Sequence, residues 1–244
     1  MTVFTALKTI FLDRQEIRWM SRKQRLIDDI VNNDLSGNYK FFTNTKDAAD
    51  WGNTHFKSWA DKIIEESFFS TENSFFTKLK AFQFQAGYFY MHVNEALRLK
   101  HNSTFIKDLT DEATYIIDEE LCQSIIPENI SVIRIVPTSF FKEYYLKKNK
   151  PEVGLIIKDE AFMSTSLDLT FEGRFDWRNV RNSRSEGLCY MFIKIKRGKN
   201  GLYLNKISGR DNEQELLLPR NTSLRIDRIL HYRKPNILLL LTLI

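Results

Sequence analysis

Hydrophobic residues follow two different periods along this chain. Between Arg14 and Val31 they recur at helical spacing, and the same spacing returns from Thr43 to Leu121. From Ser131 onward the chain carries short apolar runs that alternate with polar residues or are rich in β-branched and aromatic residues, a pattern typical of strands. Helices followed by strands predict an α+β fold, in which hairpins are favoured over parallel crossovers.

Polar residues interrupt the helical pattern most clearly between Asn32 and Asn44. We therefore expect an N-terminal helical extension over residues 1–42 and one compact domain over residues 43–244. No internal repeat or proline-rich linker divides the rest of the chain.

Two local patterns give expectations that bear on the site. Lys46 to Gly52 predicts a short helix that ends at the glycine. Lys158 to Glu160 has the character of a turn, and it precedes a strand expected from Ala161 to Ser166.

Composition excludes several classes of protein. With 244 residues, 43% hydrophobic and 27% charged, the chain can bury a sizeable core and is not expected to be disordered. The two cysteines and four histidines lack metal-ligand spacing, so we expect no metal. The run from Ile237 to Leu241 is far shorter than the roughly 20 residues that span a bilayer, so no membrane span is expected. Met1 to Leu12 contains no convincing signal peptide.

The formal net charge of +5 permits an acidic partner but does not require one. Basic residues recur between positions 174 and 199, and no nucleic-acid motif accompanies them. This cluster is typical of a solvated face. An acidic protein surface is the next expectation, and nucleic acid is not expected as a partner.

Three polar features stand on strands that are otherwise apolar. Arg134 lies within a Val-Ile-Arg-Ile-Val run, where an unpaired cation would be costly to bury, so we expect a fixed anionic partner. Alternation would place the hydroxyls of Ser164 and Ser166 on one side of their strand. The same rule would aim the carboxylates of Glu213 and Glu215 at one face of a strand entrance. Each feature alone is typical of a solvated strand face or a structural ion pair.

In this order, the three features resemble the R, S-T-S, E-x-E pattern of arginine-specific mono-ADP-ribosyltransferase toxins, which include the enzymatic components of binary actin-modifying toxins. The resemblance covers about Thr43 to Ile244. Four flanking segments also resemble the family: Ala48 to Gly52, Val93 to Arg98, Pro127 to Ile130 and Pro219 to Thr222. The resemblance implies N-terminal helices and two packed, mainly antiparallel sheets that form an NAD cleft.

The family's roles, carried onto these positions, divide the chemistry among four residues. Arg134 would pair with an NAD phosphate oxygen. Ser164 would hydrogen-bond Glu215, which would bind the ribose and stabilise the positive charge that grows as the glycosidic bond breaks. Glu213 would orient and deprotonate the acceptor guanidinium. Family members that modify Asn or Gln lack this first glutamate, so a Glu here implies arginine as the acceptor.

The resemblance also implies a loop after the serines with an aromatic that stacks on nicotinamide and an arginine that reaches the phosphates. Phe171 and Arg174 match these positions, with Phe175 and Trp177 as rival aromatics. The NAD-binding residues expected by resemblance are Arg134, Ser164, Thr165, Ser166, Phe171, Arg174 and Glu215.

We therefore expect an NAD-dependent mono-ADP-ribosyltransferase that modifies an arginine of a target protein and acts as a toxin or effector. Actin is the leading target by resemblance, but Ser208 to Asn212 lacks the aromatic with which many relatives engage their target. Such an effector would be secreted or injected, with or without a separate translocation partner, and would act in the host cytoplasm. Two alternatives remain, an NAD glycohydrolase and a catalytically inactive NAD-fold binding module.

Overall fold

The computed structural model divides into two units by its internal contacts, residues 1–38 and residues 39–244. It describes residues 18–69, 76–86, 90–99, 104–147, 149–171, 187–209, 212–233 and 235–244. In the first unit, residues 18–30 are helical and η1 (Val31–Leu35) continues them as a π-helix. The domains predicted over residues 1–42 and 43–244 stay a prediction.

The second unit begins with helices. Their bounds are α2 (Thr45–Phe69), α3 (Lys78–Ala86), α4 (Tyr90–Leu99), α5 (Thr104–Gln123), α6 (Thr138–Phe140) and η2 (Phe141–Leu146), and a short α7 (Asn205–Ser208) lies among the later strands.

The predicted helix end at Gly52 is wrong, because α2 continues through this glycine for many more residues. The helix starts where the Asn44 side chain accepts a hydrogen bond from the Asp47 backbone N–H at 2.8 Å. Beyond the start, Trp51, Phe56 and Ile63 are buried on one face. Their burial outweighs the roughly 1 kcal/mol that one interior glycine costs a helix.

The strands form one sheet of eight, in the order β2-β7-β8-β4-β1-β3-β6-β5. Their bounds are β1 (Ile130–Pro137), β2 (Ile156–Asp159), β3 (Met163–Ser166), β4 (Leu188–Ile195), β5 (Leu202–Tyr203), β6 (Glu215–Leu218), β7 (Thr222–Arg233) and β8 (Asn236–Leu243). Neighbours are antiparallel except β4 and β8, so the α+β fold is confirmed, with one parallel pair that the expected hairpins did not include.

The two expected sheets are connected parts of this single sheet. β2-β7-β8-β4-β1 forms one part and β3-β6-β5 the other, and β1 and β3 join them through one registered pair, Ile133 with Ser166. The segment from Lys158 to Glu160, expected as a turn, contains the end of edge strand β2, which pairs with β7. Because β1 and β3 are neighbours, Arg134 and Ser164 come from adjacent strands at the junction.

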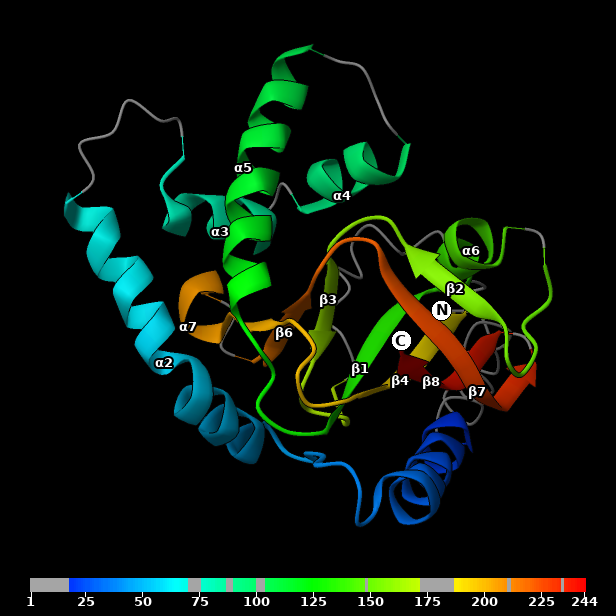
Figure 1. The fold of residues 1–244 in the computed structure, drawn as a ribbon. Coiled ribbons are helices and arrows are strands. Elements are labelled where there is room, and N and C mark those ends of the chain that lie inside the picture. The colour runs from blue at the N-terminus through cyan, green and yellow to red at the C-terminus, as the bar shows by residue number, and fades with distance from the viewer. Residues whose placement is uncertain are drawn as a thin grey trace, which may run out of the picture. The chain divides into compact units, whose positions relative to one another are not determined.

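The helices lie around this junction. Figure 1 shows α2, α3 and α5 on the side of β6, with α7 between them and the strands, while α6 lies near β2. The core between them is formed by buried side chains of both helices and strands, among them Phe82, Phe162 and Met191. No helix in the described part of the chain is long and apolar enough to cross a membrane.

Candidate active site

Ser164 and Glu215 meet across the β3–β6 pair. The register places Ser166 opposite Glu215, so Ser164 is the diagonal neighbour of the glutamate. Its hydroxyl donates a hydrogen bond of 2.6 Å to Glu215 Oε1, and the Glu215 residue is only 5% exposed. The expected contact is therefore present and holds one carboxylate oxygen in a fixed direction, while the catalytic role of Glu215 stays a prediction.

The rest of the S-T-S motif does not brace the glutamate. Thr165 donates its hydroxyl hydrogen to the Leu216 carbonyl at 2.7 Å, and the Ser166 hydroxyl accepts from the Asp168 backbone N–H at 3.2 Å. Ser166 therefore binds the turn that follows its own strand. The NAD-binding roles of Thr165 and Ser166 stay predictions.

Alternation predicted that Glu213 and Glu215 point to one face of a strand, and this prediction is wrong. β6 begins at Glu215, and Glu213 lies half-exposed in the turn before it. The residue between them, Gln214, has a φ of 48°, in the left-handed region. Alternation of side chains applies only to extended backbone, so this one residue breaks the rule.

The fixed anionic partner expected for Arg134 is Asp159. The Arg134 guanidinium donates to the Tyr145 hydroxyl at 3.1 Å and to the Ser164 carbonyl at 2.7 Å, and its Nη2 lies 3.5 Å from Asp159 Oδ2. Three different nitrogens of one planar group are used, which fixes the guanidinium beside β3.

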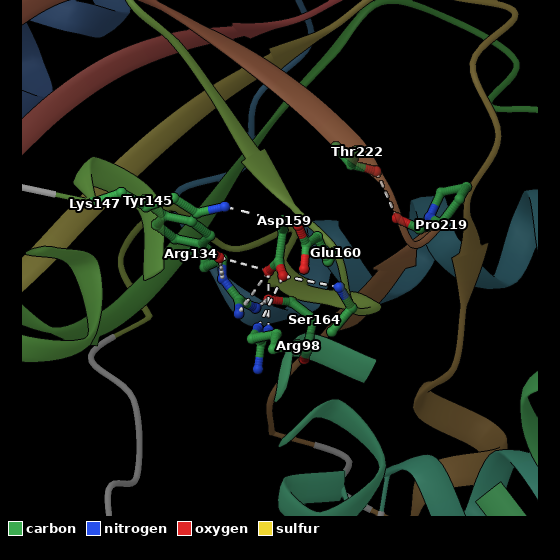
Figure 2. Close-up of polar contacts among 10 residues, drawn as sticks. Arg98, Arg134, Tyr145, Lys147, Asp159, Glu160, Ser164, Pro219 and Thr222 are labelled. Carbon is green, nitrogen blue, oxygen red and sulfur yellow. Dashed lines mark hydrogen bonds and ion pairs between the residues drawn. The ribbon is translucent and has the colours of Figure 1, made fainter. Parts of the chain in front are cut away.

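Asp159 is the centre of a buried polar cluster, and its side chain is fully buried. Figure 2 shows the side chains of Arg98, Arg134 and Tyr145 converging on it. Arg98 Nε and Nη2 each donate to one Asp159 oxygen at 3.0 Å, in the bidentate geometry of strong arginine–carboxylate pairs. The Ala161 backbone N–H donates a further bond of 3.1 Å.

Tyr145 adds a donor that keeps its proton. Its hydroxyl donates to Asp159 Oδ2 at 2.6 Å. Burial raises the pKa of the Tyr145 hydroxyl well above its ordinary value, and the Asp159 carboxylate raises it further against the opposing effect of Arg134. The hydroxyl therefore stays neutral, and its hydrogen bond stabilises the negative charge of the Asp159 carboxylate.

The cluster carries a net positive charge, because two guanidinium groups face one carboxylate. The Arg98 guanidinium also lies over the Phe140 ring, with its Cζ 4.9 Å from the ring centroid. Among the residues that the structure describes, Arg98 Nη1 has no hydrogen-bonding partner. An oriented cation with spare donors is suited to binding an anion such as a phosphate.

A surface pocket of about 230 Å³ opens beside the cluster. Arg98, Tyr145 and Asp159 line it together with Glu143, Tyr144, Lys147, Lys158 and Glu160. Two of these lining residues form an ion pair, with Lys147 Nζ 3.7 Å from Glu160 Oε1. The pocket gives solvent access to Arg98, whereas Arg134 is not among its lining residues.

Three residues of the cluster were not singled out in the sequence as parts of the site. Asp159 occupies a buried position in the alternation of β2, where Ile156 and Lys158 are exposed and Ile157 is buried. This alternation was the available signal, but the turn-like composition obscured it. Arg98 was noted only as part of a family helix, and no sequence pattern distinguished Tyr145.

The loop after the serines is only partly described. Phe171 is half-exposed, and its backbone N–H donates to the Asp168 carbonyl at 3.0 Å. Arg174 and the rival aromatics Phe175 and Trp177 lie outside the described residues. The choice among the aromatics stays open.

Known proteins resemble this chain in sequence and in fold. A sequence model of the ADP-ribosyltransferase exoenzyme family matches residues 48–241. No curated protein matches the sequence.

Solved structures with a similar fold include ADP-ribosyltransferase toxins. An ADP-ribosyltransferase from Clostridium botulinum has a TM-score of 0.62 and 19% identity over 84% of this chain and 98% of its own. An ADP-ribosyltransferase toxin from Paenibacillus larvae has a TM-score of 0.60 and 19% identity over 84% and 99%. The ADP-ribosylating toxin of a binary enterotoxin of C. perfringens, solved with NADH, has a TM-score of 0.62 and 21% identity over 85% and 50%. Since the family match spans most of the sequence, the chain belongs to the ADP-ribosyltransferase exoenzyme family.

Proposed function

We propose that this protein transfers ADP-ribose from NAD to an arginine side chain of a target protein and acts as a toxin or effector. The observation that carries the proposal is the Ser164–Glu215 contact beside the cluster of two arginines, with a second glutamate two residues earlier. Actin remains the leading target by resemblance.

The reaction breaks the bond between nicotinamide and C1′ of its ribose. Positive charge grows on the ribose as nicotinamide leaves, and the oriented carboxylate of Glu215 would stabilise it. A guanidinium nitrogen of the acceptor then bonds to C1′ and gives up a proton, which Glu213 would take. The products are free nicotinamide, ADP-ribosyl-arginine and one proton.

Arg98 and Arg134 fit the pyrophosphate of NAD by charge. Their cluster has one positive charge in excess, and it offers guanidinium donors beside the strand that carries Ser164. Phosphate oxygens would accept these donors, which would place the dinucleotide next to the carboxylate of Glu215.

The proposal also includes the expected delivery of the protein as a secreted or injected effector, with or without a translocation partner.

The alternative of an NAD glycohydrolase differs only in the acceptor, which would be water. The alternative of an inactive binding module is disfavoured because the Ser164–Glu215 contact and the Arg134 contacts are all in place. Incubation of the protein and labelled NAD with a host-cell lysate, followed by mass spectrometry of the labelled residue, separates these functions. A label on arginine supports the proposal, and a label on another residue type or on none contradicts it.

Glu213→Gln should separate transfer from hydrolysis. Glutamine cannot take the guanidinium proton, so transfer to the arginine analogue agmatine should fall by about a hundredfold, within the range known for general-base catalysis. Hydrolysis of NAD should stay within about threefold of the parent rate, since water needs no guanidinium base. Both rates are measured on the same preparation, and a parallel loss would show that Glu213 supports the pocket itself.

Arg134→Lys should weaken NAD binding although the charge is kept. Lysine presents one ammonium group where arginine uses three nitrogens at once, so the contacts to Tyr145 and Ser164 cannot both survive. We expect the Kd for NAD to rise by about tenfold, which corresponds to roughly 1.4 kcal/mol. Titration followed by intrinsic fluorescence measures the Kd, and an unchanged value would make Arg134 purely structural.

A further inference from the structure

Gln214, between the two glutamates, holds an unfavourable backbone conformation. Its φ of 48° lies in the left-handed region, which costs a residue with a side chain roughly 1–2 kcal/mol and which glycine adopts freely. The side chain is nonetheless buried, with the residue 1% exposed. A glutamine that is buried and strained between these two carboxylates indicates that its side chain has a structural or functional role.

The side chain of Gln214 is anchored by Tyr203. The Tyr203 hydroxyl donates a short hydrogen bond to Gln214 Oε1, and both residues are buried. Tyr203 lies on β5, which pairs with β6, so the anchor crosses from one strand to the turn that leads into the other. A buried contact of this kind fixes the χ angles of Gln214 and resists rotation of its backbone.

Gly52 makes room for the Tyr203 ring. A Cβ atom on Gly52 would lie 2.4 Å from Cε1 of Tyr203 and 2.5 Å from Cζ, far inside van der Waals contact. The φ of Gly52 is not positive, so its lack of a side chain serves this close approach rather than the backbone of α2. The line of contacts therefore runs from α2 through Tyr203 to Gln214.

The two glutamates depend on Gln214 to different degrees. Glu215 is part of β6, where its carbonyl accepts the Leu204 backbone N–H at 2.9 Å and its carboxylate accepts the Ser164 hydroxyl. Glu213 stands outside the strand, so the direction of its backbone relative to Glu215 depends on the torsions of the single residue between them. Disturbing Gln214 should move Glu213 more than Glu215.

We propose that Tyr203 and Gln214 act as a positioning pair that aims Glu213 at the acceptor and so sets how ADP-ribose is divided between a guanidinium and water. The proposal deepens the proposed function and rests on it, because it assumes that Glu213 serves an arginine acceptor. Tyr203 and Gln214 touch neither NAD nor the acceptor in this scheme. They act only through the carboxylate of Glu213.

Tyr203→Phe removes the hydroxyl and keeps the ring. The buried Oε1 of Gln214 then loses this hydrogen bond, so the side chain is less restrained, while the backbone carbonyl still accepts the Leu167 N–H at 3.0 Å. We expect the ratio of agmatine transfer to NAD hydrolysis to fall about fivefold to tenfold. The KM for NAD and the rate of hydrolysis should stay within about twofold of the parent, since Glu215 keeps its own contacts. An unchanged ratio, or equal loss of both activities, would overturn the positioning role.

Gln214→Gly distinguishes the side chain from the backbone. Glycine adopts the positive φ without strain, so if the backbone conformation alone aimed Glu213, this variant would keep the parent ratio. We expect its ratio to fall as in Tyr203→Phe. The double variant should be no worse than either single variant, because both remove the same contact. Additive losses would show that the two residues act separately.

Tyr190→Phe is the matched control. It makes the same chemical change at another buried tyrosine, on β4, which β1 and β3 separate from β6. Its ratio should equal that of the parent, and thermal unfolding of every variant checks the fold. If the parent yields no arginine-linked product, both the proposed function and this inference are overturned. An unchanged ratio in a transfer-competent Tyr203→Phe overturns this inference alone.

Discussion

Glu215→Gln is expected to lower the rates of ADP-ribose transfer and of NAD hydrolysis together, by about a hundredfold to a thousandfold. Both reactions break the same glycosidic bond, and the amide cannot oppose the positive charge that develops on the ribose. The loss corresponds to about 2.7–4 kcal/mol, the cost known for removing one oriented group that stabilises a transition state. The Ser164 hydroxyl already orients the carboxylate at 2.6 Å, so the charge needs little reorganisation.

Steady-state rates with agmatine and with water as acceptor measure this prediction on one preparation. Glu152→Gln makes the same chemical change at an exposed position near β2 and should leave both rates unchanged. NAD hydrolysis at a near-normal rate in Glu215→Gln would contradict a catalytic role for Glu215, whatever happens to transfer.

Local periodicity was sufficient to predict the class of fold, and it marked Arg134 and Ser164, which the family resemblance then made candidates for the site. Arg134 and Ser164 could be found because polar residues on apolar strands are conspicuous, and the junction of β1 and β3 brings them together. The Ser164–Glu215 contact followed from the family resemblance, and the structure contains it. Short sequence patterns identify the strands that carry these residues, whereas the adjacency of β1 and β3 is known only from the structure.

Other features could not be predicted because they depend on contacts between distant segments. α2 passes through Gly52 because burial of its apolar face outweighs the local cost of glycine. The same glycine admits Tyr203, which comes from a strand too short to give a periodic signal. The left-handed φ of Gln214 likewise broke an alternation rule that assumes extended backbone.

Asp159 shows the same limit at the site itself. It lies in the chain between two charged residues, a composition that favours a turn, and only pairing of β2 with β7 makes it buried. Its partners Arg98 and Tyr145 are 61 and 14 residues away along the chain. No local pattern connects them, although the buried cation of Arg134 required that some carboxylate be present.

Asp159→Asn is expected to destabilise the fold by about 3–5 kcal/mol, the usual cost of removing one partner from a buried ion pair. Asparagine has nearly the same shape and can still accept one or two hydrogen bonds, but it leaves the cations of Arg98 and Arg134 without a counter charge. The side chains of both arginines are only 10% exposed, so water can compensate little. For a chain of this size the melting temperature should fall by about 6–20 °C.

Asp118→Asn provides the matched comparison for the effect of Asp159→Asn on stability. Its carboxylate accepts a 2.6 Å hydrogen bond from Arg220, but the two side chains are 29% and 41% exposed. Exposed pairs contribute about 0–1 kcal/mol, so this variant should unfold almost like the parent. Adding Arg98→Met to Asp159→Asn removes one uncompensated cation and should recover part of the lost stability, because the two changes act on one cluster. Denaturant unfolding measures all four proteins, and equal midpoints for Asp159→Asn and Asp118→Asn would show that Asp159 does not neutralise buried charge.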